Sequence, residues 1–141
     1  MHRPTIGWRE WVGLPDLGIP SIEAKIDTGA KSSSIDVRDV HVVEGVVPTM
    51  VQFRIRLGRN RTVSAEAPIV DIRTVRNPGR GGREEQRFVI RTDIALAGER
   101  WPIEVNLARR TRMTYRMLLG REALVDRAIV DPGASYLLGK P

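Results

Sequence analysis

The stretch Ala24–Ala30, with the sequence AKIDTGA, joins a short β-favouring run to a turn-forming segment that contains an aspartate. Residues alternate over Glu23–Asp27, with charged side chains on one face and apolar ones on the other, as in a half-buried strand. Such a strand would deliver the Asp27 carboxylate to its end, where Thr28 adds a hydroxyl group and Gly29 permits a sharp turn. Because Asp-Thr-Gly also occurs in ordinary turns, a carboxylate site and a plain turn both stay open at this point.

Outward from this stretch, short runs rich in β-favouring residues are separated by glycine and proline. The runs are Val51–Leu57, Ala67–Ile72, Arg87–Arg91, Asp93–Ala97, Trp101–Leu107, Ala128–Asp131 and Tyr136–Leu138. We expect a turn between Arg87–Arg91 and Asp93–Ala97. Strands of this length and spacing predict an all-β fold of the barrel or sandwich type.

One helix is expected near the C-terminal end of the chain. The apolar run Met117–Leu119 ends at Gly120 and leads into the helix-forming residues Arg121–Val125. This pattern predicts a buried strand with a tight exit, followed by a short helix that ends near Asp126 or Arg127.

A glycine-rich stretch, Asn77–Glu85, lies between two β-like runs and predicts the tip of a long hairpin. It lacks the Gly-Lys-Ser/Thr ending of a phosphate-binding P-loop, so a nucleotide site is not expected there.

Length and composition exclude several classes of protein. The 141 residues fit one domain, residues 1–141. The chain has no cysteine and two histidines, which excludes a thiol nucleophile and argues against a Cys/His zinc site. Its apolar runs are too short for a transmembrane helix, and no signal peptide is visible at its N-terminus. We therefore expect a cytoplasmic protein that does not engage a membrane.

The net charge of +6 favours anionic partners, either nucleic acid or an acidic polypeptide. Arginine supplies 20 of the 23 basic residues, and an ordinary solvated surface is the alternative interpretation. Aromatic residues make up only 5% of the chain, which argues against base stacking and hence against nucleic acid.

Taken in order, the Asp-Thr-Gly-Ala segment, the glycine-rich hairpin and the Leu-Leu-Gly-Arg segment resemble the retropepsins, which are single-domain aspartic peptidases. The closer resemblance is to a bacterial family with a retropepsin-like fold, historically labelled putative ATP-dependent zinc proteases. The segments that carry it are Ile6–Val12, Leu14–Pro15, Ala24–Ser33, Val75–Arg76, Arg87–Ile90, Met117–Arg121 and Val130–Pro132. No His-Glu-x-x-His or Walker A motif accompanies them, so we expect no metal and no cofactor.

The resemblance implies a closed barrel of the acid-protease type, with Asp27, Thr28 and Gly29 in the catalytic loop. Aspartic peptidases use two carboxylates that share one proton. This chain holds a single Asp-Thr-Gly, so the resemblance implies a twofold homodimer in which each protomer supplies one aspartate. The glycines of the hairpin, Gly79, Gly81 and Gly82, would then form a flap over the substrate. Leu119 and Gly120 would support the dyad from beneath.

The chain departs from retroviral enzymes at Lys31, where those enzymes carry an acidic residue that pairs with the arginine of the Gly-Arg segment. Arg121 must therefore find another partner, either Asp131 or Glu122. Lys25, Lys31 and Arg121 would then make the cleft cationic, and Ala30, Lys31 and Arg121 would contact substrate. This composition favours acidic peptides such as glutamate-rich tails.

An alternative is open for these cations, which could instead pair with the acidic residues Glu23, Asp36 and Asp39 and contact no substrate. The stretch between Ala30 and the hairpin is also longer than in retroviral enzymes. It contains additional strands near Val51–Leu57 and Ala67–Ile72, which makes the flap assignment depend on the three-dimensional fold.

The sequence thus predicts a homodimeric aspartic endopeptidase acting on a peptide or protein substrate. One alternative is a non-catalytic module of the same fold that holds an acidic protein tail or a partner ligase, because the resembled family is associated with ATP-grasp ligases that add glutamate to proteins. A second alternative is a small basic β-barrel that binds RNA, for which the sparse aromatic residues give little support.

Overall fold

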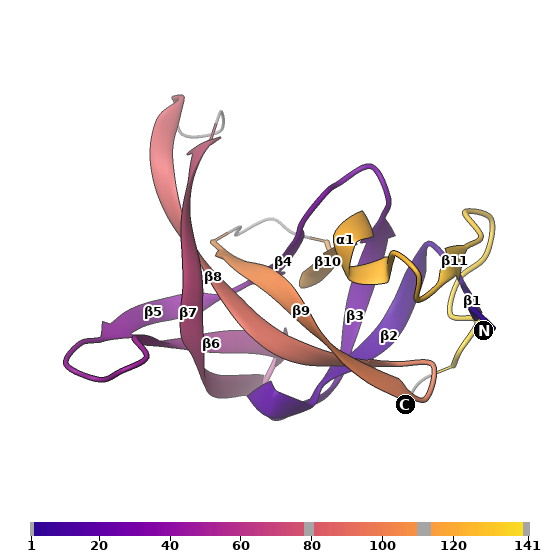
Figure 1. The fold of residues 1–141 in the computed structure, drawn as a ribbon, viewed down its shortest axis with the longest axis horizontal. Coiled ribbons are helices and arrows are strands. Elements are labelled where there is room, and N and C mark those ends of the chain that lie inside the picture. Colours follow the sequence, from indigo (N-terminus) through magenta and orange to yellow (C-terminus); the bar gives the residue numbers. More distant parts are fainter. Residues whose placement is uncertain (1, 78–80, 110–113, 140–141) are drawn as a thin grey trace.

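The computed structural model describes residues 2–77, 81–109 and 114–139, and these residues form mostly strands (Figure 1). The strands are β1 (Thr5–Ile6), β2 (Arg9–Leu14), β3 (Ile19–Asp27), β4 (Ser33–Asp36), β5 (Arg38–Val43), β6 (Met50–Gly58), β7 (Arg61–Asn77), β8 (Arg83–Leu96), β9 (Glu99–Ala108), β10 (Met117–Gly120) and β11 (Ile129–Val130). The helical elements are the 3-10 turn η1 (Pro15–Leu17) and the short helix α1 (Arg121–Leu124). The prediction of an all-β fold with one short α-helix directly after Gly120 is confirmed.

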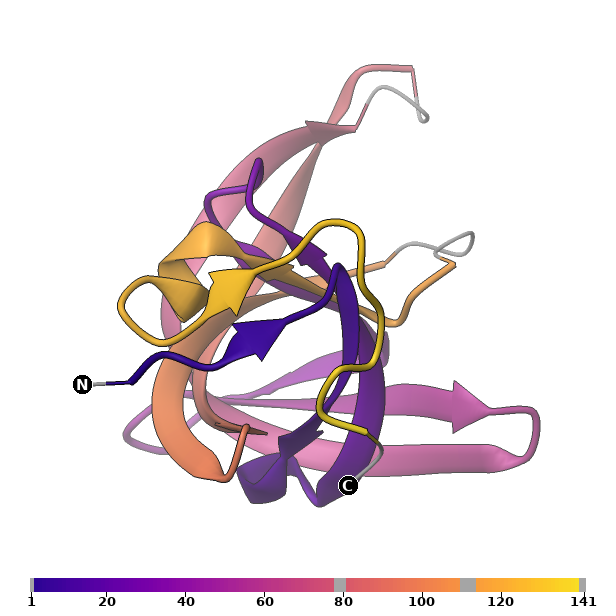
Figure 2. The same cartoon turned by 90° about the vertical axis from the view of Figure 1, so that its right-hand side faces the viewer.

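The main sheet closes on itself and leaves three strands outside the closure. Its order is β2-β3-β10-β4-β9-β8-β7-β6-β5, and β2 also pairs with β8 through Gly13 and Ala95. A Cβ atom on Gly13 would lie 3.3 Å from the Ala95 Cβ atom, so small residues permit this approach. The strands from β2 to β8 thereby form a ring, visible in Figure 2, while β7, β6 and β5 continue the sheet beyond it.

The apolar core extends from this ring to the strands beyond it and follows from alternation along the strands. On β6, Val51, Phe53 and Ile55 are buried, and the residues between them are exposed. Trp101 lies on β9 and donates its indole N–H to the carbonyl oxygen of Ala123, 3.0 Å away, which fixes α1 against the sheet.

Strand β7 belongs to two parts of the sheet. Its first half, up to Pro68, pairs with β6, whereas the segment from Ile69 onward pairs with β8, with an irregularity between Ile69 and Asp71. The β7–β8 hairpin rises beyond the body of the molecule in Figure 1, on the same side as the loop between β3 and β4. The structure thus contains the predicted long hairpin, and Gly81 and Gly82 follow its tip with φ angles of 68° and 75°. Gly79 lies outside the described residues.

Three local predictions are wrong. The turn expected near Thr92 is absent, because β8 runs through it continuously and pairs with β9 over its C-terminal half. The helix ends at Leu124 instead of Asp126 or Arg127, and Asp126 has a φ of 63°, which a continuing helix cannot adopt. The run Tyr136–Leu138 is not a strand.

The C-terminal segment is held instead by a buried carboxylate. Glu10 on β2 has 0% of its surface exposed. Its carboxylate accepts the backbone N–H groups of Gly7 at 2.7 Å, Leu137 at 2.9 Å and Leu138 at 3.3 Å. One side chain therefore ties β2 to segments from both ends of the described chain.

This arrangement predicts the effect of removing the carboxylate. Glu10→Ala leaves three backbone N–H groups without their acceptor, and we expect it to lower the free energy of unfolding by about 3 kcal/mol. Chemical denaturation measures the loss, with the exposed Glu84→Ala as the matched control. Equal stability of the two variants would contradict the role assigned to Glu10.

Candidate active site

Strand β10 lies between β3 and β4 and pairs with both. It runs parallel to β3, with Gly120 opposite Asp27, and antiparallel to β4, with Met117 opposite Ile35. The chain from β3 to β4 must therefore pass around the end of β10. This topology places the Asp-Thr-Gly segment and the Leu-Leu-Gly-Arg segment side by side, as the resemblance implied.

The turn after β3 positions the Asp27 side chain. The Asp27 Oδ1 atom accepts the N–H group of Gly29 at 3.0 Å, and the Asp27 carbonyl oxygen accepts the N–H group of Ala30 at 3.1 Å. Asp27 itself is half-buried, whereas Thr28 and Gly29 are exposed. The carboxylate is thus held by its own turn at a surface of the isolated chain.

Gly120 lies directly under this turn. A Cβ atom there would lie 2.4 Å from the carbonyl oxygen of Ser32 and 2.9 Å from that of Ala30, both backbone atoms. The Gly120 N–H group donates to the Ser33 Oγ atom at 3.0 Å, and Ser33 is buried. The sequence alone does not single out Ser33, because nothing in the run Ser32–Ser34 shows which serine faces β10.

Helix α1 extends the support. The N–H group of Arg121 donates to the Ala30 carbonyl oxygen at 2.8 Å, and that of Glu122 to the Lys31 carbonyl oxygen at 3.2 Å. The Arg121 Nη1 atom donates to the Gly29 carbonyl oxygen at 3.2 Å. The sequence-predicted residues from Asp27 to Lys31 therefore lie together with Leu119, Gly120 and Arg121.

The prediction that Arg121 pairs with Asp131 or Glu122 is wrong. Its guanidinium contacts the Gly29 carbonyl oxygen, and within residues 2–77, 81–109 and 114–139 no carboxylate pairs with it. Asp131 instead accepts the N–H group of Gly133, and Glu122 lies 3.7 Å from the Lys31 ammonium group. Because Arg121 is not neutralised by an acidic neighbour, its charge stays beside the Asp27 turn.

The alternative, in which the local cations pair with Glu23, Asp36 and Asp39, is not seen in the ion pairs and hydrogen bonds of the described residues. The Glu23 carboxylate accepts the Tyr136 hydroxyl at 2.8 Å. Asp36 pairs with Arg116 at 2.9 Å, and Asp39 lies 3.6 Å from Arg54. The cations around Asp27 are thus Lys25, Lys31 and Arg121, all exposed, with Glu122 offsetting one of them.

An aromatic cluster that sequence reasoning missed braces the adjoining strands. Arg9, opposite Lys25 on β3, lies 4.6 Å over the Trp8 ring and 4.8 Å over the Tyr136 ring. Its hydrogen bond to the Tyr115 hydroxyl raises the pKa of Arg9, and burial together with the bond to Glu23 raises the pKa of Tyr136. The residues come from three segments that are distant in the sequence, so no local motif predicts the cluster.

Two features are absent from the part of the chain that the structure describes. No group of three or more His, Asp or Glu side chains is arranged to hold a metal ion. No described helix has the length and apolar character needed to cross a membrane.

Comparison with known proteins identifies the class to which this fold and site belong. A family model described as the retropepsin-like aspartic endopeptidase RimB matches residues 5–141. The chain therefore belongs to the RimB-like family of retropepsin-like aspartic endopeptidases. A crystal structure of a Legionella pneumophila protein of unknown function is similar, with a TM-score of 0.81 and 29% identity over 96% of this chain and 98% of that one.

Curated relatives carry a different description. A probable alpha-L-glutamate ligase of Desulfotalea psychrophila is 41% identical over 98% of this chain, and one of Parasynechococcus marenigrum is 40% identical over 95%. The matched region makes up only 30% and 29% of those proteins. This chain thus spans about three-tenths of the length of the curated relatives it matches.

The geometry beneath Asp27 predicts a strict requirement at position 120. Gly120→Ala forces a methyl group against backbone carbonyl oxygens, and we expect it to cost about 3 kcal/mol of stability or to prevent folding. Gly58→Ala is the matched control, since a Cβ atom there meets nothing within 4 Å. Denaturant midpoints compare the two, and a Gly120→Ala protein as stable as the control would refute the packing described.

Proposed function

We propose that this protein is an aspartic endopeptidase whose dyad consists of two Asp27 carboxylates, one from each protomer of a twofold homodimer. The observation that carries the proposal is the Asp27-Thr28-Gly29 turn, held against Gly120 at an exposed end of β3. The chain contains one such segment, and the chemistry needs two carboxylates. Pairing the exposed turns of two copies would supply the second carboxylate without a second Asp-Thr-Gly segment in the chain.

In this mechanism, the dyad shares one proton because two adjacent carboxylates cannot both ionise. The ionised Asp27 removes a proton from water, whose oxygen attacks the scissile carbonyl carbon, while the protonated Asp27 donates to the carbonyl oxygen. Proton transfer to the amide nitrogen then releases the amine as the C–N bond breaks. The dyad returns to its singly protonated state, so the reaction needs water alone.

The β7–β8 hairpin is the candidate flap. It rises on the same side of the molecule as the β3–β4 loop in both views (Figures 1 and 2). In the proposed dimer, Gly81 and Gly82, together with Gly79 outside the described residues, would belong to a flap that covers the substrate and shields the site from bulk water. The positive φ angles of Gly81 and Gly82 support a tight reversal close to the tip.

Acidic polypeptides, glutamate-modified proteins among them, are the proposed substrates. Lys25, Lys31 and Arg121 surround the Asp27 turn, and Arg121 has no acidic partner among the described residues. Ala30, whose carbonyl oxygen is bound by α1, would line the same cleft. The likeness to proteins named probable alpha-L-glutamate ligases supports a glutamate-rich substrate and a ligase as partner, and the proposed location is the cytoplasm.

A second candidate is a non-catalytic module of the same fold that holds an acidic tail for a ligase. The names of the curated relatives favour it, because the matched region there is a minor part of proteins described as ligases. It needs neither Asp27 nor a second copy, and these two requirements separate the candidates.

The first separating test is Asp27→Asn, which keeps the shape of the side chain and removes its base. We expect cleavage of glutamate-rich peptides to fall by at least about 10²–10⁴-fold, with unchanged unfolding and oligomeric state. Mass spectrometry of a peptide library measures cleavage, and Asp71→Asn, on the exposed part of β7, is the control. Full cleavage by Asp27→Asn would eliminate the dyad and favour the binding module.

The second test asks whether the two carboxylates come from different protomers. Co-refolding wild-type and Asp27→Asn chains in equal amounts makes wild-type pairs about one quarter of all dimers. The activity should therefore fall to about one quarter of that of wild-type protein at the same total concentration. Activity at one half, the value for independent monomers, would refute the shared dyad.

A further inference from the structure

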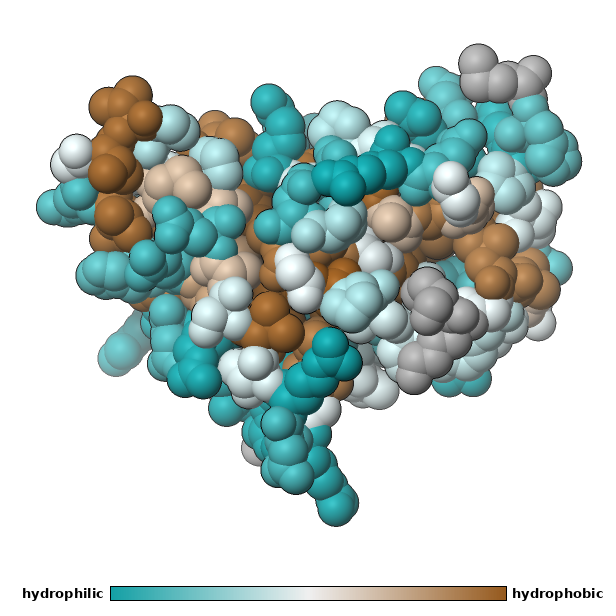
Figure 3. All heavy atoms as spheres, turned by 90° about the horizontal axis from the view of Figure 1, so that it is seen from below, coloured by the Kyte–Doolittle hydropathy of each residue, from teal (hydrophilic) through white to brown (hydrophobic). Residues whose placement is uncertain are grey.

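The outer surface of the strands beyond the ring carries an unusual concentration of arginine. We call this surface the arginine face and define it by Arg38 on β5, Arg54 and Arg56 on β6, and Arg59 in the β6–β7 turn. Together with Asp39 and Thr62 these residues line a hollow of about 260 Å³. The hairpin that bears the turn projects from the body in Figure 2, and Figure 3 shows its end covered by hydrophilic side chains.

The strand register brings like charges together. Arg38 lies directly opposite Arg54, an arrangement that is destabilising when no counter-charge intervenes. On the other side, β7 places Ser64 opposite Arg54 and Thr62 opposite Arg56, so hydroxyl groups stand where carboxylates would neutralise the arginines. The only acidic residue lining the hollow is Asp39.

Several other arginines of the described chain are paired more closely. Arg73 and Arg91 both contact Glu104, at 3.5 and 3.2 Å, and Arg116 contacts Asp36 at 2.9 Å. In the arginine face the single ion pair is the longer one between Arg54 and Asp39, at 3.6 Å, as far as residues 2–77, 81–109 and 114–139 show. This face therefore carries a surplus of positive charge, which favours an anionic ligand.

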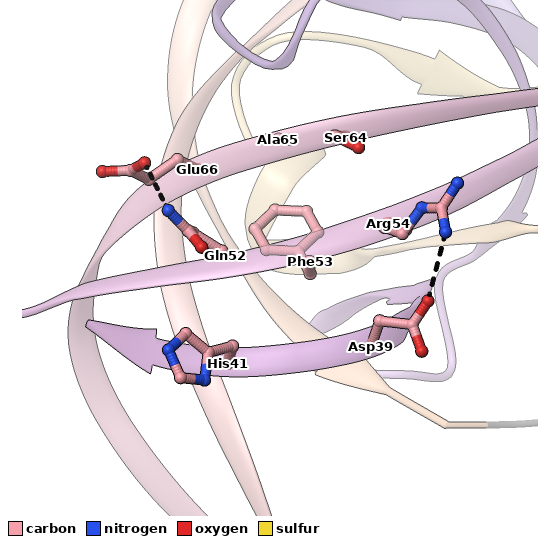
Figure 4. A pocket seen from close by; sticks show the side chains of 8 residues that line it. All are labelled: Asp39, His41, Gln52, Phe53, Arg54, Ser64, Ala65 and Glu66. Atoms are coloured by element: carbon pink, nitrogen blue, oxygen red, sulfur yellow. Dashed lines mark hydrogen bonds and ion pairs between the residues drawn. The ribbon is translucent and has the colours of Figure 1, made fainter.

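A second hollow, of about 460 Å³, adjoins the first along the same strands, and we call the two together the groove (Figure 4). It begins at the Arg54–Asp39 pair and extends past His41 to Gln52, which donates to Glu66 at 3.2 Å. Strand β5 is the last strand of the sheet order, so its outer edge is available to pair with an added strand.

The spacing of the arginines fits an extended acidic peptide. Alternate side chains of an extended strand repeat about every 6.8 Å, and Arg54 and Arg56 occupy alternate positions of β6. Carboxylates at every second residue of a bound strand would match this interval. Phe53 beside the second hollow is 1% exposed and offers no face for base stacking, which leaves the single exposed ring of His41 and gives little support to nucleic acid.

We infer that the arginine face is an exosite that binds an extended, glutamate-rich polypeptide segment. Anion binding at this face stands on its own observations, whereas its role as a substrate anchor rests on the proposed endopeptidase function. Figure 2 shows the β6–β7 end and the β3–β4 loop at different places on the molecule, so the exosite would hold a substrate segment remote from the scissile bond.

Binding of a fluorescein-labelled decaglutamate, measured by anisotropy with Asp27→Asn protein, tests the exosite without cleavage. We expect Arg54→Gln combined with Arg56→Gln to weaken binding about tenfold. The control, Arg73→Gln with Arg91→Gln, removes the same charge from a surface where both arginines already face Glu104. It should leave the affinity within about twofold, since screening limits distant charges.

Several results would overturn the inference. They are no measurable binding of decaglutamate, equal weakening by both double variants, and tighter binding of a single-stranded RNA of equal charge. Loss of binding only on substitution of Lys31 and Arg121 would instead place the peptide at the Asp27 turn.

The catalytic proposal fails separately. If wild-type protein binds decaglutamate through the arginine face but shows no Asp27-dependent cleavage, the exosite stands and the endopeptidase does not. If cleavage depends on Asp27 and the Arg54 and Arg56 substitutions leave KM for glutamate-rich substrates unchanged, the endopeptidase stands and the exosite does not.

Discussion

The close approach of Gly120 to the turn after β3 is the contact on which the rest of the site depends. Space for one hydrogen atom, and not for a methyl group, lets β10 enter between β3 and β4. The same approach lets the backbone of α1 bind the carbonyl oxygens of Ala30 and Lys31. The Arg121 side chain then donates a hydrogen bond to the carbonyl oxygen of Gly29, which lies 92 positions earlier in the chain. Asp27 is thus positioned mainly by backbone contacts, which side-chain motion cannot easily disturb.

The sheet has two parts, a closed ring that holds the Asp27 turn and three further strands that extend the sheet beyond the ring. The ring closed through Gly13 and Ala95 encloses part of the core and carries the Asp27 turn. Beyond it, β7 bends near Ile69 and pairs with β6 on one side of the bend and with β8 on the other. A single strand therefore connects the candidate flap to the arginine face, so neither of them is an independent appendage.

Sequence reasoning located what alternation and glycine chemistry encode locally. The alternation of Val51–Leu57 predicts β6, and Gly120 predicts the tight exit into α1. It failed where tertiary partners decide: Thr92 interrupts an apolar pattern, yet pairing with β9 keeps β8 continuous. Likewise, the serine that faces Gly120 and the acceptor of Arg121 depend on which strands are adjacent. The arginine face could not be predicted for the same reason, because Arg38 and Arg54 become neighbours only through the β5–β6 register.

Electrostatics gives a physical reason to separate substrate anchoring from peptide hydrolysis. A dyad of two aspartates that shares one proton still carries a negative charge, and every glutamate brought close to it adds repulsion that opposes binding. With Glu122 facing Lys31, the cations Lys25, Lys31 and Arg121 leave only a small positive surplus beside each Asp27, which a run of several glutamates would exceed. In the proposed arrangement, holding most of a glutamate-rich segment on Arg38, Arg54, Arg56 and Arg59 would keep those carboxylates away from the dyad while retaining their attraction to the protein. The few cations near the proposed dyad would then need to neutralise only the residues that flank the scissile bond.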